Sequence, residues 1–206
     1  HPFQVKDDKQ MALLKESIEK YGILNPLIVR PKKEGYYEII SGHRRIHIAK
    51  ELGYRKVPVI IRVLNDTDAV ISMVDSNVQR EMLLPSEKAF AYKMKNEAMK
   101  HAGRISTKGQ VVHNYEKGKK TIDYISEECG ESPKQIQRYI RLTYLIPELL
   151  KKVDAAEIGM NTCVQLAYIK SEEQEMVWDM MEYLQTVPSL SQANKIKDLS
   201  REGKLT

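Results

Sequence analysis

The amino-acid sequence predicts an α+β protein in which a small mixed α/β domain is followed by an all-α domain. Two patterns lead to this fold class. Short β-rich runs alternate with helical patterns only as far as about residue 65. Beyond that point apolar residues recur at helical spacing, in segments separated by Gly and Pro. The 206 residues are enough for two such domains.

The composition is that of a soluble globular protein, with 42% hydrophobic and 30% charged residues. No apolar run is long enough to cross a bilayer. The start, His-Pro-Phe-Gln, has neither a signal peptide nor an initiator Met, so we expect a processed chain or an excised piece. The formal net charge of +5 permits an anionic partner without requiring one. Cys129 and Cys163 lie outside any CxxC pattern, which favours free thiols in a reducing cytoplasm.

The first domain is expected to contain a helix, a β-hairpin, a second helix and a third strand, with Gly or Pro near their ends. In order, these elements cover residues 9–21, 27–40, 44–52 and 57–61. Two longer helices follow. One covers residues 68–79, and the other runs from about Pro85 to Gly103 with Phe90, Met94 and Ala98 on its buried side.

A helix-turn-helix pattern occupies residues 121–146, after a basic connector over residues 104–120. The first helix carries apolar residues on one face, Gly130 makes the turn, and Ser132 caps a second helix that begins at Pro133. Two ordinary packed helices would give the same pattern, so DNA binding is one of two interpretations here. Further helices are expected over residues 147–153 and 162–169, around Trp178 and Met181, and over residues 191–199.

The corner Ser41-Gly42-His43-Arg44-Arg45 has the features of a phosphate site. An apolar run ends at Gly42, and a helix begins at once with two arginines in its first turn. Glycine lets the backbone approach a ligand, the free N–H groups of a helix start point outward, and guanidinium groups add fork-shaped donors. A strand-to-helix corner of this kind is also a common way to turn the chain. A helix end at residues 75–80, with an acid, two amides and a cation, could hold a metal–phosphate complex or be merely solvated.

Other chemistry is disfavoured by the same residues. His43 and His47 are four apart, but Arg44 stands where the zinc-protease pattern needs Glu. Neither Cys lies beside a His or at a basic helix start, and Ser41 has no base identifiable from sequence. A metal site on the two histidines and triad-type hydrolysis are therefore both poor interpretations.

The second helix of the helix-turn-helix offers side chains suited to DNA. Gln and Arg can make bidentate contacts to adenine and guanine edges, and Lys can hold phosphate. The first helix is acidic and should face away from a duplex, while the basic connector could lie along the DNA backbone. The predicted DNA contacts are Lys119 from the connector and Lys134, Gln135, Gln137, Arg138 and Arg141 from the second helix.

Taken together, these segments resemble the ParB family of chromosome and plasmid partition proteins, and the likeness covers nearly the whole chain. Five ordered matches are more specific than any one of them. They are His1–Gln4, Gly22–Val29, Ser41–Arg45 (usually Gly-Glu-Arg-Arg in the family), Asn77–Glu81 with Leu84–Glu87, and the helix-turn-helix at 121–142.

The resemblance implies a ParB/sulfiredoxin-like N-terminal fold and a CTP-dependent DNA clamp that acts in plasmid or chromosome segregation. In the family, the N-terminal domain binds CTP and Mg²⁺. Binding of a centromere-like DNA site promotes closure of two N-terminal domains around the duplex, and slow CTP hydrolysis resets the clamp. The resemblance thus implies a homodimer through the N-terminal domain and a possible ParA-type ATPase partner. No match to the family's C-terminal dimerisation domain is found in this sequence, which agrees with an excised piece. The implied domains are a nucleotide module at 1–65, a helical extension completing its site at 66–103, and a DNA-binding domain at 104–206.

Carried over residue by residue, the resemblance implies nucleotide contacts from all three boxes. Three positions depart from the family pattern: His43 replaces the usual Glu, and Val5-Lys6 replaces the Pro-Arg of the first box. The third bears on hydrolysis, because Ser76 stands where the family usually has an acid linked to the metal and to hydrolysis. Asp75 is one position away, a turn of about 100° on a helix. We therefore expect CTP binding and leave a slow CTPase activity open. The implied nucleotide contacts are Gln4, Asn25, Ser41, Gly42, His43, Arg44, Arg45, Asn77 and Arg80, with Asn77 also at the metal.

Two alternatives remain at the level of sequence. One is a ParB-like transcriptional regulator that has lost CTP binding or hydrolysis. The other is an enzyme, because the N-terminal fold is similar to that of sulfiredoxin and of some small kinases. Sulfiredoxins carry Gly-Cys-His-Arg, whereas this chain reads Gly42-His43-Arg44 without Cys, and no dense carboxylate cluster suggests a two-metal nuclease. The leading interpretation predicts a cytoplasmic, nucleoid-associated prokaryotic protein.

Overall fold

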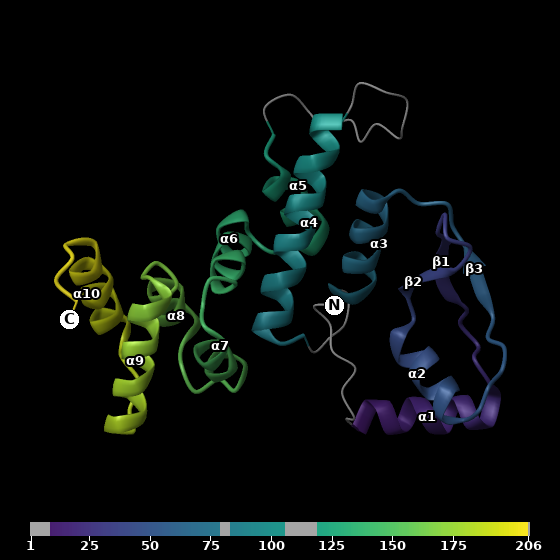
Figure 1. Ribbon diagram of the computed structural model, residues 1–206, viewed down its shortest axis with the longest axis horizontal. Helices are drawn as coiled ribbons and strands as arrows, with labels where there is room; N and C mark the ends of the chain where they lie inside the picture. Colours follow the sequence, from purple (N-terminus) through teal and green to yellow (C-terminus); the bar gives the residue numbers. More distant parts are fainter. Residues whose placement is uncertain (1–8, 79–82, 106–118, 206) are drawn as a thin grey trace. The chain divides into compact units, whose positions relative to one another are not determined.

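The computed structural model describes residues 9–78, 83–105 and 119–205. The chain divides into two units (Figure 1). The first comprises residues up to Arg80 together with 98–111, and the second comprises residues 81–97 together with 112–206. No helix within the described ranges is long and apolar enough to cross a membrane.

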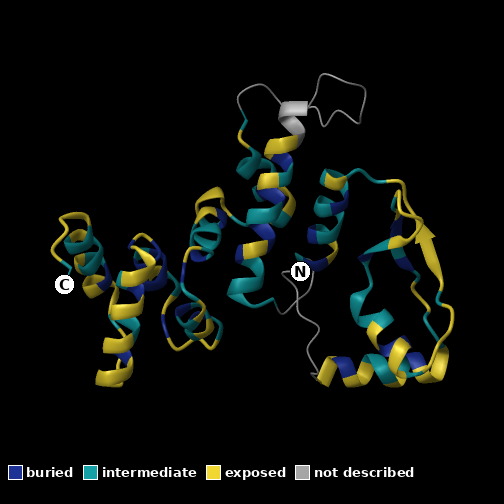
Figure 2. Cartoon of the chain, viewed as in Figure 1, coloured by how far each residue is buried: buried dark blue, intermediate teal, exposed yellow. Residues whose placement is uncertain are grey.

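A three-stranded sheet forms the centre of the first unit. Its strands are β1 (Leu27–Pro31), β2 (Tyr37–Ser41) and β3 (Val59–Ile61), in the order β2-β1-β3. β1 pairs antiparallel with β2 and parallel with β3, which confirms the predicted hairpin and third strand. All three residues of β3 are exposed, as Figure 2 shows. The β1–β2 register shifts where Ile28 faces Ser41 and Val29 faces Ile39, a bulge that lies immediately before Gly42.

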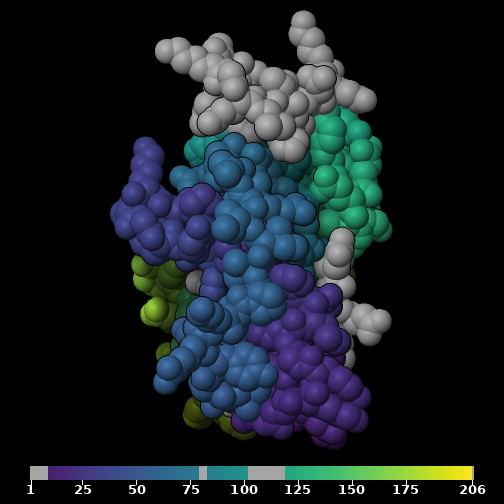
Figure 3. Space-filling model, turned by 90° about the vertical axis from the view of Figure 1, so that its right-hand side faces the viewer, coloured from purple at the N-terminus to yellow at the C-terminus, as the bar shows by residue number. Residues whose placement is uncertain are grey.

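Three helices belong to the first unit, and each begins within two residues of its predicted start. They are α1 (Lys9–Tyr21), α2 (His43–Glu51) and α3 (Asp66–Val78). Met11 and Ile18 of α1 form a small core with Ile48 of α2, because the apolar residues recur on one face of each helix. In Figure 3, α1 (purple) lies directly against the blue segment that follows β2.

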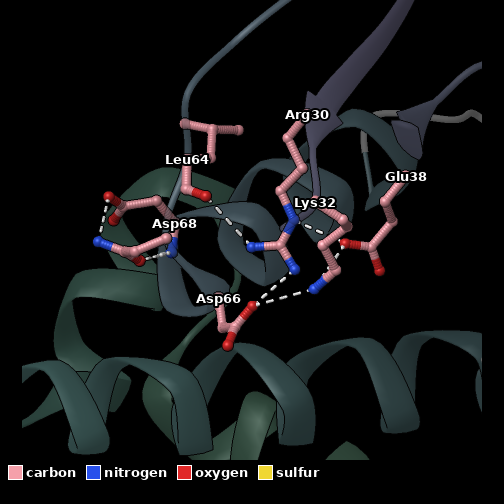
Figure 4. A network of polar contacts seen from close by, with 7 residues as sticks. Arg30, Lys32, Glu38, Leu64, Asp66 and Asp68 are labelled. Atoms are coloured by element: carbon pink, nitrogen blue, oxygen red, sulfur yellow. Dashed lines mark hydrogen bonds and ion pairs between the residues drawn. The ribbon is translucent and has the colours of Figure 1, made fainter. Parts of the chain in front are cut away.

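A buried arginine joins the sheet to α3 (Figure 4). Arg30 of β1 donates to Glu38 Oε2 at 2.6 Å and to the Leu64 carbonyl at 3.2 Å, and it pairs with Asp66 Oδ1 at 2.7 Å. Burial opposes the charge on Arg30, but the hydrogen bonds to both carboxylates outweigh burial and raise its pKa. Hydrogen bonds from Arg30 lower the pKa of Glu38 and of Asp66. The network places the first turn of α3 beside the sheet.

The second unit is all-α, as predicted. Its core holds Leu142, Leu149 and Leu166, which are fully buried. The buried Gln174 is satisfied by the Ile146 N–H and by two carbonyls at 2.9–3.1 Å, so it joins three segments at the centre of the unit. The helices are the first part of α4 (Pro85–Ile105) together with α5 (Thr121–Cys129), α6 (Pro133–Leu142), α7 (Pro147–Asp154), α8 (Met160–Leu166), α9 (Ser171–Leu184) and α10 (Leu190–Arg201).

The buried face predicted for α4 is wrong. Phe90 is 36% exposed, whereas Ala89, Tyr92 and Lys95 are at most 1% exposed. The orientation is set by polar partners that an apolar pattern does not reveal, since Lys95 forms an ion pair with Glu128. Residues 66–103, grouped as one extension from sequence, thus contribute to both units, and the part of α4 up to residue 97 belongs with the second.

Candidate nucleotide and DNA sites

The corner between β2 and α2 can be occupied only by glycine without strain. Gly42 has φ 110° and ψ 22°, in the left-handed region. A side-chain carbon placed on it would lie 2.8 Å from Leu27 Cγ and 3.3 Å from Arg45 Nη2. Leu27 is fully buried in β1 and cannot move aside cheaply. The chain therefore passes close to the sheet here, and the position requires glycine.

The start of α2 brings the positive end of a helix dipole to this corner. Gly42 makes no side-chain cap hydrogen bond, and the first turn contains no acidic residue. The first intrahelical bond runs from Ile46 N to Gly42 O at 3.0 Å. The amides of the first turn and the helix dipole together favour an anion. The phosphate interpretation of the corner stays a prediction.

The two arginines of the corner point to different neighbours. Arg45 Nη1 donates to the carbonyls of Asn25 and Pro26, the second at 3.0 Å, and burial lowers the pKa of Arg45. Arg44 reaches α1, with Nη1 3.4 Å from Gln10 Oε1. Arg45 therefore joins the segment before β1 to the corner, which brings the predicted residues Asn25, Ser41, Gly42 and Arg45 together. Their contact with a nucleotide stays a prediction.

The end of α3 is more closed than the sequence suggests. Asn77 is 4% exposed, and its Nδ2 donates to the Met73 carbonyl at 2.8 Å. Ser76 is exposed and bonds the same carbonyl at 2.9 Å. α3 packs against β2, the strand that leads into Gly42. The predicted nucleotide contacts Gln4 and Arg80 lie outside the described residues.

No group of three His, Cys, Asp or Glu residues suited to a metal occurs among the described residues. His47 Nε2 instead lies 3.1 Å from Glu51 Oε1, and the same carboxylate pairs with Lys15. Cys129 and Cys163 are free thiols.

The helix-turn-helix is present at the predicted positions. Gly130 ends α5 with φ 70°, and Ser132 Oγ accepts from Gln135 N at 3.2 Å at the start of α6. Ile125 of α5 and Ile136 of α6 are fully buried, so the pair is packed through its apolar faces. The opposite side of α6 carries the polar residues.

Most predicted DNA contacts share one face of α6. Lys134, Gln137, Arg138 and Arg141 follow the spacing of a single helix face, and Lys134 and Gln137 are exposed. Arg138 Nη1 lies 3.4 Å from Gln135 Oε1, which holds its guanidinium along that face. Gln135 also points to Met160 Sδ at 3.4 Å.

Acidic residues of α5 are paired with cations, which lowers the repulsion that they would exert on DNA. Lys119 Nζ lies 2.6 Å from Glu127 Oε1 and 4.6 Å from the Tyr124 ring centroid. Glu128 pairs with the buried Lys95. Of the predicted basic connector, residues 106–118 lie outside the described part of the chain.

A cluster of tyrosines and cations beside α6 was not predicted. The Arg141 guanidinium lies 4.0 Å from the Tyr168 ring centroid and 5.0 Å from that of Tyr144. Lys93 and Lys197 approach the same two rings. These residues come from segments far apart in the sequence, so no local pattern could have grouped them.

Comparisons with known proteins confirm the resemblance noted in the sequence. Residues 1–78 match the model of the ParB N-terminal domain. The nucleoid occlusion protein of Bacillus cytotoxicus is 30% identical over 175 residues, covering 85% of this chain and 54% of that protein. The chromosome-partitioning protein Spo0J of Thermus thermophilus is 27% identical over 191 residues, covering 93% and 62%. The chain thus spans 54–62% of the length of these relatives.

Two solved structures share the fold. C-terminally truncated ParB of Caulobacter crescentus, complexed to the centromeric parS site, aligns with a TM-score of 0.52 at 20% identity, covering 98% of this chain and 92% of that one. A Pnob8-like ParB-N domain aligns with a TM-score of 0.53 at 15% identity, covering 100% and 91%. At these identities the likeness supports the predicted α+β fold class.

Proposed function

We propose that this chain, whose residues 1–78 belong to the ParB N-terminal domain family, is a site-specific DNA-binding partition protein that uses CTP as a switch. The observation that carries the proposal is the corner at Gly42. At this corner, a position that only glycine can occupy without strain precedes a helix that has no side-chain cap and carries two arginines in its first turn. The same chain contains a helix-turn-helix.

In the proposed site, the first turn of α2 holds the phosphates of CTP, because it lies at the positive end of the helix dipole and contains no acidic residue. Arg44 supplies charge from the same turn. Arg45 has a second role, since its bonds to the Asn25 and Pro26 carbonyls hold the segment before β1 against the corner. That segment is our candidate for the base contact.

Mg²⁺ fits this site only as part of a metal–triphosphate complex. The described residues offer no protein cluster for the ion, so most of its ligands would be phosphate oxygens and water, which is the usual arrangement for this ion. Asn77 Oδ1 is the proposed protein ligand. When bound, the ion neutralises triphosphate charge. Ser76 cannot act as an anionic base at neutral pH, so we propose that binding is retained and that hydrolysis is slow or absent.

The DNA part of the proposal rests on α6. Its exposed face presents Lys134, Gln137 and Arg138, which suit a major groove. α5 packs against α6, and Ile125 and Ile136 are fully buried. The chromosome-partitioning and nucleoid occlusion names of the relatives agree with a DNA partner. A second copy that closes around the duplex, a ParA-type ATPase partner and a location on the nucleoid are further parts of this proposal.

Calorimetric titration tests the switch. CTP with Mg²⁺ is added to the whole chain, alone and with a DNA site that the chain itself has selected from a random pool. We expect saturable CTP binding that the selected site strengthens, and no binding of ATP. An Arg45→Ala variant should lose most of the CTP affinity while its DNA site selection is unchanged.

A second candidate, a DNA-binding regulator that has lost the nucleotide, is favoured by Ser76 at the position of the usual acid. DNA selection without any heat from millimolar CTP would establish that regulator and refute the switch.

A further inference from the structure

Five residues of the second unit alternate as cation and tyrosine on its surface, and we call them the cation–tyrosine ladder. In order of contact they are Lys93, Tyr144, Arg141, Tyr168 and Lys197. Lys93 Nζ lies 5.0 Å from the Tyr144 centroid, and Arg141 Cζ lies 5.0 Å from Tyr144 and 4.0 Å from Tyr168. Lys197 Nζ lies 5.8 Å from the Tyr168 centroid. The ladder thus joins α4, α6 and α10 through the segments that follow α6 and α8.

The ladder differs from the other cation–ring contacts of the unit in its charge. Lys88 over Tyr139, Lys119 over Tyr124 and Lys152 over Trp178 each also pair with a glutamate. Among the described residues, no carboxylate pairs with any of the three ladder cations. In the part of the chain that the structure describes, the cations have one side-chain hydrogen-bond partner, the uncharged Gln165, whose Oε1 lies 2.6 Å from Lys197 Nζ. Three positive charges are therefore held near one another without neutralisation.

A purely structural role does not account for this arrangement. Tyr144 is 55% exposed and Tyr168 is 54% exposed, so the rings bury little surface. Attraction of a cation to an exposed ring is weak, and the like charges repel one another. An anion placed on the ladder would remove that repulsion, so the arrangement is suited to binding and adds little to stability.

The position of Arg141 indicates which anion. Arg141 follows Lys134 by seven residues and Arg138 by three, so all three lie on one face of α6. The ladder therefore continues the face that carries the proposed base contacts, at the opposite end of the helix. In a duplex, the groups that flank a base-reading helix are the phosphates of the groove wall.

We propose that the cation–tyrosine ladder binds the phosphate backbone of double-stranded DNA beside the groove that α6 reads. The inference rests on the proposed DNA-binding function and extends it to α4 and α10. The tyrosine rings hold the long cationic side chains in place, so that these side chains lose less conformational entropy when phosphate binds.

The salt dependence of binding to a random-sequence DNA duplex tests the ladder, with the whole chain as the protein. Each phosphate contact removed should lower the slope of log affinity against log salt by about one. Lys197→Gln and Lys93→Gln should each do so. Lys195→Gln is the matched control, because Lys195 is exposed on the same helix and two residues away, about 200° around the axis. It should leave the slope unchanged.

The rings provide a readout without any change of charge. Tyr168→Leu should weaken duplex binding several-fold, whereas Tyr168→Phe keeps the ring and should bind as the unaltered chain does. Both variants keep Arg141 and Lys197, so a loss in the Leu variant alone reports their positioning.

The outcomes separate this inference from the proposed function. If the unaltered chain binds duplex DNA and Lys197→Gln behaves like Lys195→Gln, the ladder is not a backbone contact and only the inference fails. If the unaltered chain binds no duplex DNA, both fail. If the two ladder lysine variants keep the salt slope but lose binding to polyglutamate, the face belongs to an acidic protein partner, and the inference is again overturned.

Discussion

Replacing Gly42 with alanine tests whether the corner is as tightly built as the structure indicates. The new methyl carbon would lie 2.8 Å from Leu27 Cγ, closer than carbon atoms pack, and would hold a non-glycine residue at φ 110°. Backbone strain of this kind costs on the order of 1–3 kcal/mol. Overpacking against a buried side chain costs about 1–3 kcal/mol more. The smaller entropy of an unfolded alanine returns roughly 0.4–1 kcal/mol.

We therefore expect Gly42→Ala to destabilise the first unit by about 1–5 kcal/mol. Gly35→Ala is the matched control, because Gly35 has φ 84° but nothing lies within 4 Å of its added carbon. The control carries the strain without the overpacking. The two variants should differ by about 1–3 kcal/mol, which is the overpacking contribution.

Hydrogen exchange followed by mass spectrometry measures this difference where it arises. Peptides that contain β1 and α2 report on the corner, while peptides from α7 and α9 in the second unit serve as an internal reference. A difference of about 1.4 kcal/mol corresponds to a tenfold change in exchange rate. Equal exchange in the Gly42→Ala and Gly35→Ala variants would show that Leu27 does not close the corner, and would refute this reasoning.

Further predictions concern ionisation and DNA contacts. Arg30 lowers the pKa of Glu38 and of Asp66. Their contribution to stability is therefore present above the ordinary carboxyl pKa of about 4 and is lost as pH falls through the lowered values. Acid unfolding should show this loss in the unaltered chain and much less of it in the Arg30→Met variant. Burial raises the pKa of Cys163 to about 12, so alkylation at pH 8 should modify Cys129 first and reach Cys163 only on unfolding. Arg138→Ala should weaken binding to a selected DNA site by about 1–3 kcal/mol more than binding to random DNA, whereas Lys119→Ala should weaken both about equally; equal losses in both variants would contradict the assignment of α6.

The sequence predicted elements well where local periodicity decides the structure. The spacing of Met11 and Ile18, with Gly22 behind them, was enough to predict α1 over its observed residues. Local patterns were also enough to predict the hairpin and the helix pair around Gly130, because turn residues and apolar faces are local signals. The turn from strand to helix at Gly42 was also predicted from residue types, while its binding of phosphate stays a prediction.

What sequence could not predict depends on contacts between distant residues. The buried face of α4 was predicted wrongly because Lys95 is buried and paired with Glu128. From sequence, a lysine at that position is expected to be exposed to solvent. The hydrogen bonds from Arg45 to the Asn25 and Pro26 carbonyls join positions 20 and 19 residues apart. The acceptors are backbone carbonyls, so no pattern of charged residues in the sequence indicates these bonds. The cation–tyrosine ladder combines four segments of the second unit, so no window of sequence contains it.

Backbone amide shifts on addition of CTP and Mg²⁺ test the central claim most directly, namely that the corner at Gly42 holds the nucleotide phosphates. Nuclear magnetic resonance resolves the N–H groups of His43, Arg44 and Arg45, which form the first turn of α2. We predict that the signals of these three amides shift most and reach saturation at the same CTP concentration. The amides around Asn25 should also shift, by a smaller amount, because Arg45 is hydrogen-bonded to that segment. If saturating CTP leaves the chemical shifts of these amides unchanged, or changes only those of residues elsewhere, the account is contradicted.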